Sequence, residues 1–108
     1  MQNSLEFIAS EEDNLLKERY NSSVSDFFKA IATLCDYVIY RDMKILPKNH
    51  NDRFDLLKDY FKDIYLKVFP LFQIYRNSYN LRLKKEDALK LRELAHELRR
   101  IAENKGSI

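Results

Sequence analysis

Glycine and proline are scarce in this sequence, which has one glycine and two prolines among 108 residues. All-β folds need turn-forming residues at short intervals, so this scarcity excludes a sandwich or barrel of many short strands. It favours long helices joined by few loops. The single glycine, Gly106, also excludes the glycine-rich loop that cradles phosphate groups in many nucleotide-binding enzymes.

Cysteine is equally rare, and Cys35 has no second cysteine with which to form an internal disulfide. A chain without disulfides fits a reducing compartment, so we expect a cytoplasmic protein. No Cys/Cys or Cys/His spacing typical of zinc ligands occurs, and the sequence predicts neither a metal site nor a cofactor. No apolar run approaches the ~18 residues that span a membrane, and the acidic start does not resemble a secretion signal.

Charged residues are plentiful but unevenly distributed. Residues 1–75 contain 10 Lys and Arg against 12 Asp and Glu, a net charge of −2, whereas residues 76–108 contain 9 against 5, a net of +4. A positive C-terminal part attracts phosphate-bearing ligands. A solvated helix face with unbalanced charge is the alternative explanation of the same counts.

Apolar residues recur at helical spacing along most of the chain. A first helix is predicted over residues 5–16 with Ser4 as its N-cap, followed by a turn in the polar residues 17–23. A continuous apolar stripe from Val24 to Ile39 predicts a central helix that ends near Met43. Cys35 lies within this stripe and is interpreted as a buried core residue, not as a nucleophile.

Three further helical segments follow in the second half. Asn49 or Asn51 is expected to cap the first of them. Asp63 and Pro70 interrupt the apolar phase, so we expect a break near Asp63 and a kink or late start near Pro70. The last helix should begin near Glu86, because acidic residues favour a helix N-terminus. Residues 1–108 are therefore predicted to form one all-α domain, a four- to five-helix antiparallel bundle.

Two residues with functional potential each have a structural alternative. His50 lies between a proline-containing loop and a helix start, where functional residues often occur, but such a histidine commonly packs or caps. Tyr79 follows Arg76 by about one helical turn, so a base stacked on Tyr79 would bring its phosphate to Arg76. Equally, the Tyr79 ring packs on the helix with only its hydroxyl at the surface.

The order of these features resembles the HEPN superfamily, small helical domains associated with nucleotides and RNA. The resemblance covers residues 19–101 and rests on the alanine- and aromatic-rich ERYNSSVSDFFKAIATLCDYVIY, the Pro-x-x-His of ILPKNH before DRFDLL, and the Arg-Asn of YRNSY before KKEDALKLRELAHELRRI. It implies a HEPN-like bundle that dimerises around a polar cleft. Similarity to the helical companions of minimal nucleotidyltransferases implies a separate nucleotidyltransferase subunit as a partner.

The ribonucleases of this superfamily carry an Arg, usually a polar residue next to it, and a His with four to six residues between Arg and His. Arg76 and Asn77 match the first half of this motif, but the positions of the His hold Leu81, Arg82 and Leu83. Imidazole titrates near neutral pH and can transfer a proton, whereas leucine has no proton to transfer and arginine stays protonated. The incomplete motif therefore argues against ribonuclease activity.

Three functions are compatible with these patterns. The preferred one is a non-catalytic, homodimeric domain whose cleft binds a nucleotide, RNA or a nucleotidyltransferase partner. Its candidate ligand-binding residues are Arg76, Asn77, Tyr79, Arg82 and His50. The second is a toxin-like ribonuclease in which another base, such as His50, replaces the missing histidine. The third is a structural dimerisation domain in which Arg76 pairs with a carboxylate inside the interface.

Overall fold

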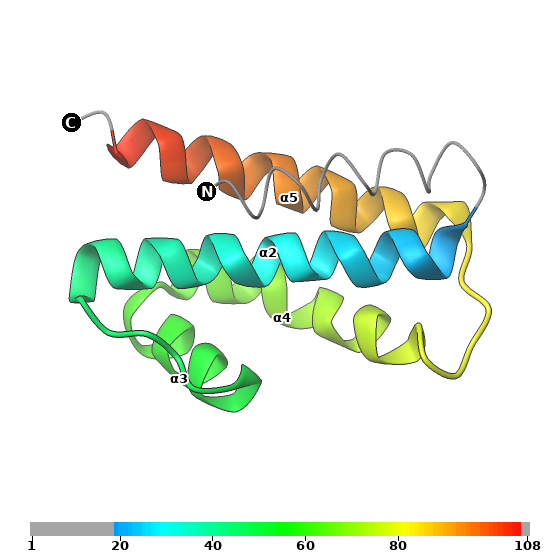
Figure 1. Ribbon diagram of the computed structural model, residues 1–108, viewed down its shortest axis with the longest axis horizontal. Coiled ribbons are helices and arrows are strands. Elements are labelled where there is room, and N and C mark those ends of the chain that lie inside the picture. The colour runs from blue at the N-terminus through cyan, green and yellow to red at the C-terminus, as the bar shows by residue number, and fades with distance from the viewer. Residues whose placement is uncertain (1–18, 107–108) are drawn as a thin grey trace.

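The computed structural model describes residues 19–106, with side chains described up to residue 103. This part of the chain forms four helices: α2 (Tyr20–Met43), α3 (His50–Tyr60), α4 (Lys62–Asn77) and α5 (Lys85–Gly106). The predicted all-helical bundle is confirmed for these residues, and Figure 1 shows α2 between α5 and the α3–α4 pair. The predicted first helix, residues 5–16 with its cap Ser4, lies outside the described residues.

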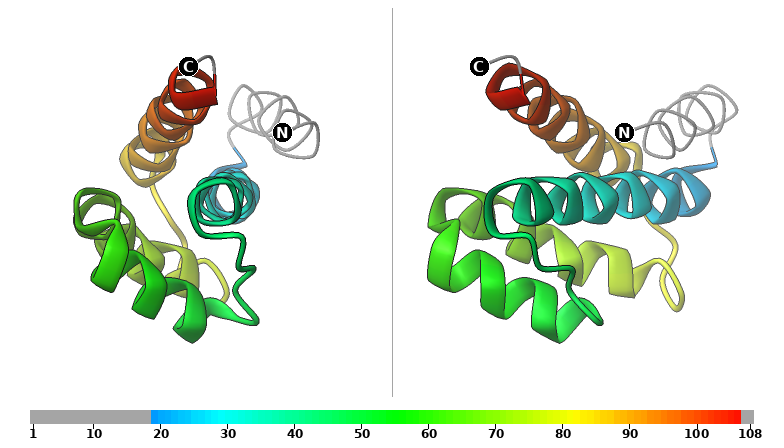
Figure 2. Two further views of the ribbon diagram at one scale, coloured as in Figure 1. Left: turned by 90° about the vertical axis from the view of Figure 1, so that its left-hand side faces the viewer. Right: turned by 60° about the vertical axis from the view of Figure 1, so that its left-hand side comes forward.

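The helix directions correct one part of the prediction, because α2 and α5 run parallel (Figures 1 and 2). Arg41 near the end of α2 donates from Nη1 to the carbonyl oxygen of Ala102 near the end of α5, at 3.1 Å. Asn21 near the start of α2 accepts from the backbone N–H of Leu83, just before α5, at 2.9 Å. The extended connection 44–49 leads the chain back along α2 before α3 begins, so of the four helices within residues 19–106 only α4 runs antiparallel to both long helices.

The core forms around α2, whose apolar stripe is buried against all three other helices. Its buried apolar residues are Val24, Phe27, Phe28, Ala30, Ile31, Leu34, Cys35, Val38 and Ile39, as the spacing predicted. Burial raises the pKa of the Cys35 thiol to about 12, because the thiolate would lose its hydration. Cys35 is therefore a packed thiol that stays protonated at neutral pH, as expected of a core residue.

The start of α2 differs from the prediction, since residues 20–23 are helical where a turn was expected. The side chain of Asn21 explains the difference. Its Nδ2 donates to the carbonyl oxygens of Ser78 at 2.9 Å and Leu81 at 2.6 Å, in the connection between α4 and α5. Contacts more than 55 positions away along the chain stabilise this first turn of α2, and a local pattern of polar residues cannot reveal them.

The connection between α2 and α3 agrees with the predicted limits. α2 ends at Met43, and Lys44 adopts a left-handed conformation with φ of 60° while its N–H donates to the carbonyl oxygen of Tyr40 at 2.8 Å. Asn49 is the residue that caps α3, because its Oδ1 accepts the backbone N–H of Asp52 at 2.8 Å.

The break between α3 and α4 lies at Phe61, two residues before the expected position, and α4 continues through Pro70. Phe61 leaves the helical region at φ −138° and ψ 56°, while its ring packs on the core. Pro70 and Leu66, four residues before it, are both exposed. Water can therefore hydrate the Leu66 carbonyl, which has no N–H donor because residue 70 is a proline. The helix can thus continue through Pro70.

The last helix begins where the acidic residues predicted, with Glu86 and Asp87 in the first turn of α5. Asp87 also accepts the backbone N–H of Lys84 at 3.0 Å, which fixes the chain as it enters the helix. The face of α5 that meets α2 is made of alanine and leucine: Ala88, Leu91, Leu94, Ala95, Leu98 and Ala102. None of the helices within residues 19–106 has the length and apolarity needed to cross a membrane.

Candidate functional site

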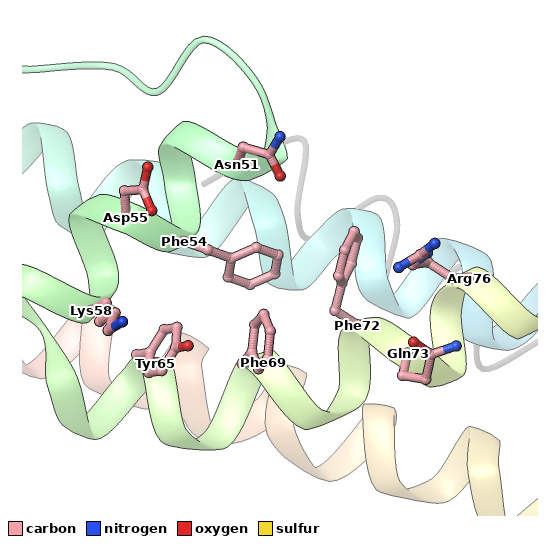
Figure 3. Close-up of a pocket in the computed structure, with 9 residues that line it drawn as sticks. All are labelled: Asn51, Phe54, Asp55, Lys58, Tyr65, Phe69, Phe72, Gln73 and Arg76. Carbon is pink, nitrogen blue, oxygen red and sulfur yellow. The ribbon is translucent and has the colours of Figure 1, made fainter.

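A groove with a volume of about 390 Å3 lies between α3 and α4 (Figure 3). Its lining residues are spaced i, i+3, i+4 and i+7 on α3, and i, i+4, i+7, i+8 and i+11 on α4, so each set occupies one helical face. They are Asn51, Phe54, Asp55 and Lys58 from α3, and Tyr65, Phe69, Phe72, Gln73 and Arg76 from α4. We call this cavity the α3–α4 groove.

Aromatic rings form the floor of the α3–α4 groove. The ring of Phe54 lies 4.8 Å from that of Phe72 and 5.3 Å from that of Phe69, measured between centroids. Tyr65 stacks on Phe69 at 5.2 Å. Phe54 is buried, but Phe69 has 47% of its surface exposed. An exposed ring held in place by packed neighbours offers a flat apolar surface on which a planar group can stack.

Polar side chains surround this floor, with Arg76 and Gln73 at one end of the groove and Lys58 at the other (Figure 3). Among the side chains described, up to residue 103, no hydrogen bond or ion pair engages those of Asn51, Asp55, Lys58 or Arg76. Polar groups without partners that converge on an apolar surface are characteristic of a ligand-binding site.

Arg76 is the predicted site residue that the structure places in the α3–α4 groove. Its guanidinium carbon lies 5.9 Å from the centroid of the Phe72 ring, and the residue is exposed. The cation–π contact restrains the guanidinium beside the ring without using its N–H groups. These N–H groups form a planar fork of donors, so an anion at this end of the groove can accept two parallel hydrogen bonds.

Three side chains form a polar chain across α2 and α3: Asp36, Arg53 and His50. Arg53 donates from Nε to Asp36 Oδ1 at 2.7 Å and from Nη2 to Oδ2 at 2.9 Å, a bidentate pair. Its Nη1 lies 2.6 Å from Nδ1 of His50. Because a guanidinium can only donate, Nδ1 of His50 must accept, and the neutral imidazole carries its proton on Nε2.

The surroundings of His50 favour this neutral form. Burial lowers the pKa of His50 below its usual 6.5, and the positive charge of Arg53 lowers it further, while Asp36 opposes the shift. The ring contacts Phe28 and Phe72, with centroids 5.8 and 5.1 Å away. His50 therefore packs between helices, which is the structural alternative given for it from the sequence. It does not line the α3–α4 groove.

The remaining candidate residues lie outside the groove. Asn77 is half-buried and accepts the Nε2–H of Gln73 at 3.0 Å. Tyr79, 67% exposed, borders a separate depression that Ser22 also lines, and Arg82 is exposed in the connection between α4 and α5. Successive residues of a helix point about 100° apart, so neighbours of Arg76 in sequence face other directions. The five candidates therefore do not line one groove.

Tyr79 lies just beyond the end of α4 and is nevertheless positioned by Tyr75 in the last turn of that helix. Its hydroxyl lies 2.8 Å from that of Tyr75, one turn earlier, and the Tyr75 ring stacks on Phe28 at 4.5 Å. Burial raises the pKa of Tyr75 to about 12, and the hydrogen bond with Tyr79 adds to the rise. The Tyr75 phenol is thus neutral at physiological pH and anchors the end of α4 to the core.

Several residues of the groove and of the polar chain were not predicted as such from the sequence. Asn51, Asp55 and Lys58 carry a weak signal, because polar residues at i, i+4 and i+7 mark one face of a short helix. The isolated acid Asp36 inside the apolar stripe of α2 is a second signal, since such a residue needs a buried partner. The sequence does not identify this partner as Arg53.

Comparison with known proteins adds no assignment to this geometry. The chain matches no family model, no curated protein and no solved structure. The part of the chain that the structure describes also contains no cluster of three or more His, Cys, Asp or Glu side chains placed to bind a metal ion. The functional argument therefore depends on the chemistry of the α3–α4 groove.

Proposed function

We propose that this chain is a non-catalytic binding domain whose α3–α4 groove binds a nucleotide, either free or as part of an RNA strand. The observation that carries this proposal is the guanidinium of Arg76, which has no hydrogen-bond or ion-pair partner within residues 19–103 and lies beside the exposed aromatic floor. A nucleotide combines a planar base with an anionic phosphate, and these match the rings and the cation respectively.

Both ends of the groove contribute to this match. The base stacks on the exposed ring of Phe69, and the phosphate accepts hydrogen bonds from Arg76. Lys58 lies at the opposite end, separated from Arg76 by the aromatic rings (Figure 3). A second phosphate of a strand can reach Lys58, whereas a mononucleotide that is bound at Arg76 needs only one cation.

The interactions of His50 support a binding function over the ribonuclease alternative. A general base must offer a lone pair, and Nδ1 of His50 already accepts from Arg53. Proton uptake at Nδ1 would break this hydrogen bond, and a second positive charge would then face the guanidinium of Arg53. His50 is thus poorly suited to replace the histidine that the ribonuclease motif lacks.

We extend the proposal to the assembly and the fold family. The Pro-x-x-His at the start of α3 and the Arg-Asn at the end of α4 support a HEPN-like bundle, with a minimal nucleotidyltransferase subunit as its partner. Leu66, 59% exposed, and the exposed Pro70 one turn later form an apolar stripe on α4 outside the α3–α4 groove, which supports a homodimer. The free thiol of Cys35 supports a cytoplasmic location.

The test is a binding and cleavage assay with fluorescently labelled single-stranded RNA and labelled nucleotide. We expect the wild type to bind the labelled ligand without cleaving it. Arg76→Ala should bind about tenfold more weakly, because it loses hydrogen bonds to a charged phosphate. Arg82→Ala is the matched control, since Arg82 is an exposed arginine outside the groove. Circular dichroism of both variants should match the wild type.

Each other outcome of this assay has a defined meaning. Equal binding by the wild type, Arg76→Ala and Arg82→Ala would show that the ligand does not bind in the α3–α4 groove. Absence of any binding would overturn the proposal and favour a structural dimerisation domain. Cleavage that depends on Arg76 would establish the ribonuclease alternative instead.

A further inference from the structure

Asp55 is an unexpected residue in a groove that binds anions. Its carboxylate lines the α3–α4 groove on the same face of α3 as Asn51 and Lys58. Within residues 19–103 it accepts no hydrogen bond and forms no ion pair, although Lys58 is only three residues away. A negative charge here repels a phosphate and favours a bound group that presents hydrogen-bond donors to it.

The position of Asp55 is suited to the base of a nucleotide. In Figure 3 the rings of Phe54, Phe69 and Phe72 lie between Asp55 and Arg76. A base that stacks on these rings with its phosphate at Arg76 therefore directs its opposite edge towards Asp55. The groove thus offers a cation to the phosphate, rings to the face of the base and a carboxylate to its edge.

The four bases differ in what they present to a carboxylate. Guanine has two adjacent donors, N1–H and the N2 amino group, which match the two oxygens of a carboxylate. Adenine and cytosine each place an acceptor next to their amino group, and this acceptor repels the second oxygen. Uracil has one N–H between two carbonyl groups. Guanine is therefore the base that can satisfy both oxygens of Asp55.

We infer that Asp55 makes the α3–α4 groove selective for guanine nucleotides, by accepting hydrogen bonds from N1–H and the N2 amino group. This inference rests on the proposed function, because it assumes that the groove binds a nucleotide. It adds a base preference that the other groove residues do not provide. Asn51 and Lys58 flank Asp55 and can contact the sugar or a neighbouring phosphate, groups that all four nucleotides share.

The test is to measure the affinities of GMP, IMP, AMP, CMP and UMP for the full chain by isothermal titration calorimetry. IMP is the sharpest probe, since inosine keeps N1–H but lacks the N2 amino group. We expect GMP to bind about tenfold more tightly than IMP, in the range of one bidentate base contact. For Asp55→Asn, which removes the charge but keeps the side-chain size, GMP and IMP should bind about equally.

Asp59→Asn is the matched control, because Asp59 is an exposed acid one turn farther along α3 and does not line the groove. This variant should keep the wild-type preference. The 5′-phosphorylated RNAs GUUU and UUUU separate a free nucleotide from a strand as the ligand. If the ligand is a strand, GUUU binds more tightly than GMP, and replacement of Lys58 by alanine removes that gain.

The failure of this inference is distinguishable from the failure of the proposed function. If all five nucleotides bind with similar affinity and Arg76→Ala weakens them all, nucleotide binding stands and guanine selectivity is overturned. The same conclusion follows if Asp55→Asn retains the preference for GMP over IMP. If no nucleotide or RNA binds, both proposals are overturned.

Discussion

Arg53 shows how much one side chain contributes to the junction of α2 and α3. Its guanidinium bonds both oxygens of Asp36 and Nδ1 of His50, and its side chain is only 12% exposed. We expect Arg53→Ala to lower the free energy of unfolding by about 2 kcal/mol, because the half-buried Asp36 carboxylate loses both donors. Urea denaturation measures this loss.

A second substitution separates the ion pair from the packing of the arginine. In the double variant Asp36→Leu/Arg53→Met, neither charge of the ion pair remains. Its loss of stability should therefore be smaller than the sum of the losses in Asp36→Leu alone and Arg53→Met alone. Lys58→Ala, a change on the exposed side of the same helix, should alter stability by less than about 0.5 kcal/mol. Additive losses in the double variant would contradict the proposed coupling.

His50 gives the protein a predictable response to acid. Its pKa is lowered in the folded state by burial and by Arg53, so below pH 6.5 the unfolded chain binds the proton more readily than the folded chain. The free energy of unfolding should therefore fall as the pH decreases from 6.5 towards the lowered pKa of the folded state. The slope from this one group is at most about 1.4 kcal/mol per pH unit.

The measurement compares the wild type with His50→Gln, which cannot take up a proton. Denaturation at pH 7.5 and pH 5.5 should show a smaller loss of stability in the variant, which differs from the wild type only at residue 50. The charged and titratable groups near the imidazole are Arg53, Asp36 and Tyr75. Equal losses in the two proteins would show that His50 does not titrate in this range.

At the scale of helices, the sequence predicted the elements better than their contacts. The stripe of α2, its end at Met43 and the start of α5 follow from local periodicity and from local capping chemistry. The first turn of α2 and the passage of α4 through Pro70 could not be predicted in this way. The first depends on bonds to the distant α4–α5 connection, and the second on which face of α4 meets water.

Asn21 provides the test of this long-range stabilisation. Its side chain makes three hydrogen bonds to the backbone of Ser78, Leu81 and Leu83, so it fixes the connection between α4 and α5. We expect Asn21→Ala to cost about 2 kcal/mol of stability and to speed amide hydrogen exchange in residues 78–83. Ser22→Ala, at the exposed neighbouring position, should change neither quantity.

Asn49 provides a local counterpart. Replacement of this N-cap by alanine should destabilise the protein by about 1 kcal/mol, because the N–H of Asp52 loses its acceptor. Asn51→Ala should be close to neutral for stability, since Asn51 lies inside α3 and its side chain makes no hydrogen bond within the described residues. Thermal unfolding of the two variants distinguishes the capping residue from its neighbour.

At the scale of the whole molecule, the sequence predicted a helical bundle but not the directions of its helices or the composition of its groove. Periodicity reports which face of a helix is apolar, and it carries no information on whether α2 and α5 run parallel. The α3–α4 groove exists only because two helical faces meet across the turn at Phe61. Arg76 could be singled out by its motif, whereas Asp55 is identified as a candidate ligand-binding residue only by its position beside the aromatic rings of the groove.

The exposed face of α4 yields the last prediction. Leu66 lies one turn before the exposed Pro70 and outside the α3–α4 groove, on a helix whose opposite face is already buried through Ile64 and Val68. Such a second apolar stripe favours contact with a copy of the chain. In a dimer built on this stripe, Leu66→Glu would place two charges in the interface and shift the molecular mass measured by light scattering from dimer to monomer.

Leu46→Glu, a change at an exposed leucine in the connection 44–49, should leave the mass unchanged. A wild type that is monomeric at micromolar concentration would contradict the dimer, and because the α3–α4 groove is lined by one chain alone, nucleotide binding would remain to be judged by Arg76 and Asp55.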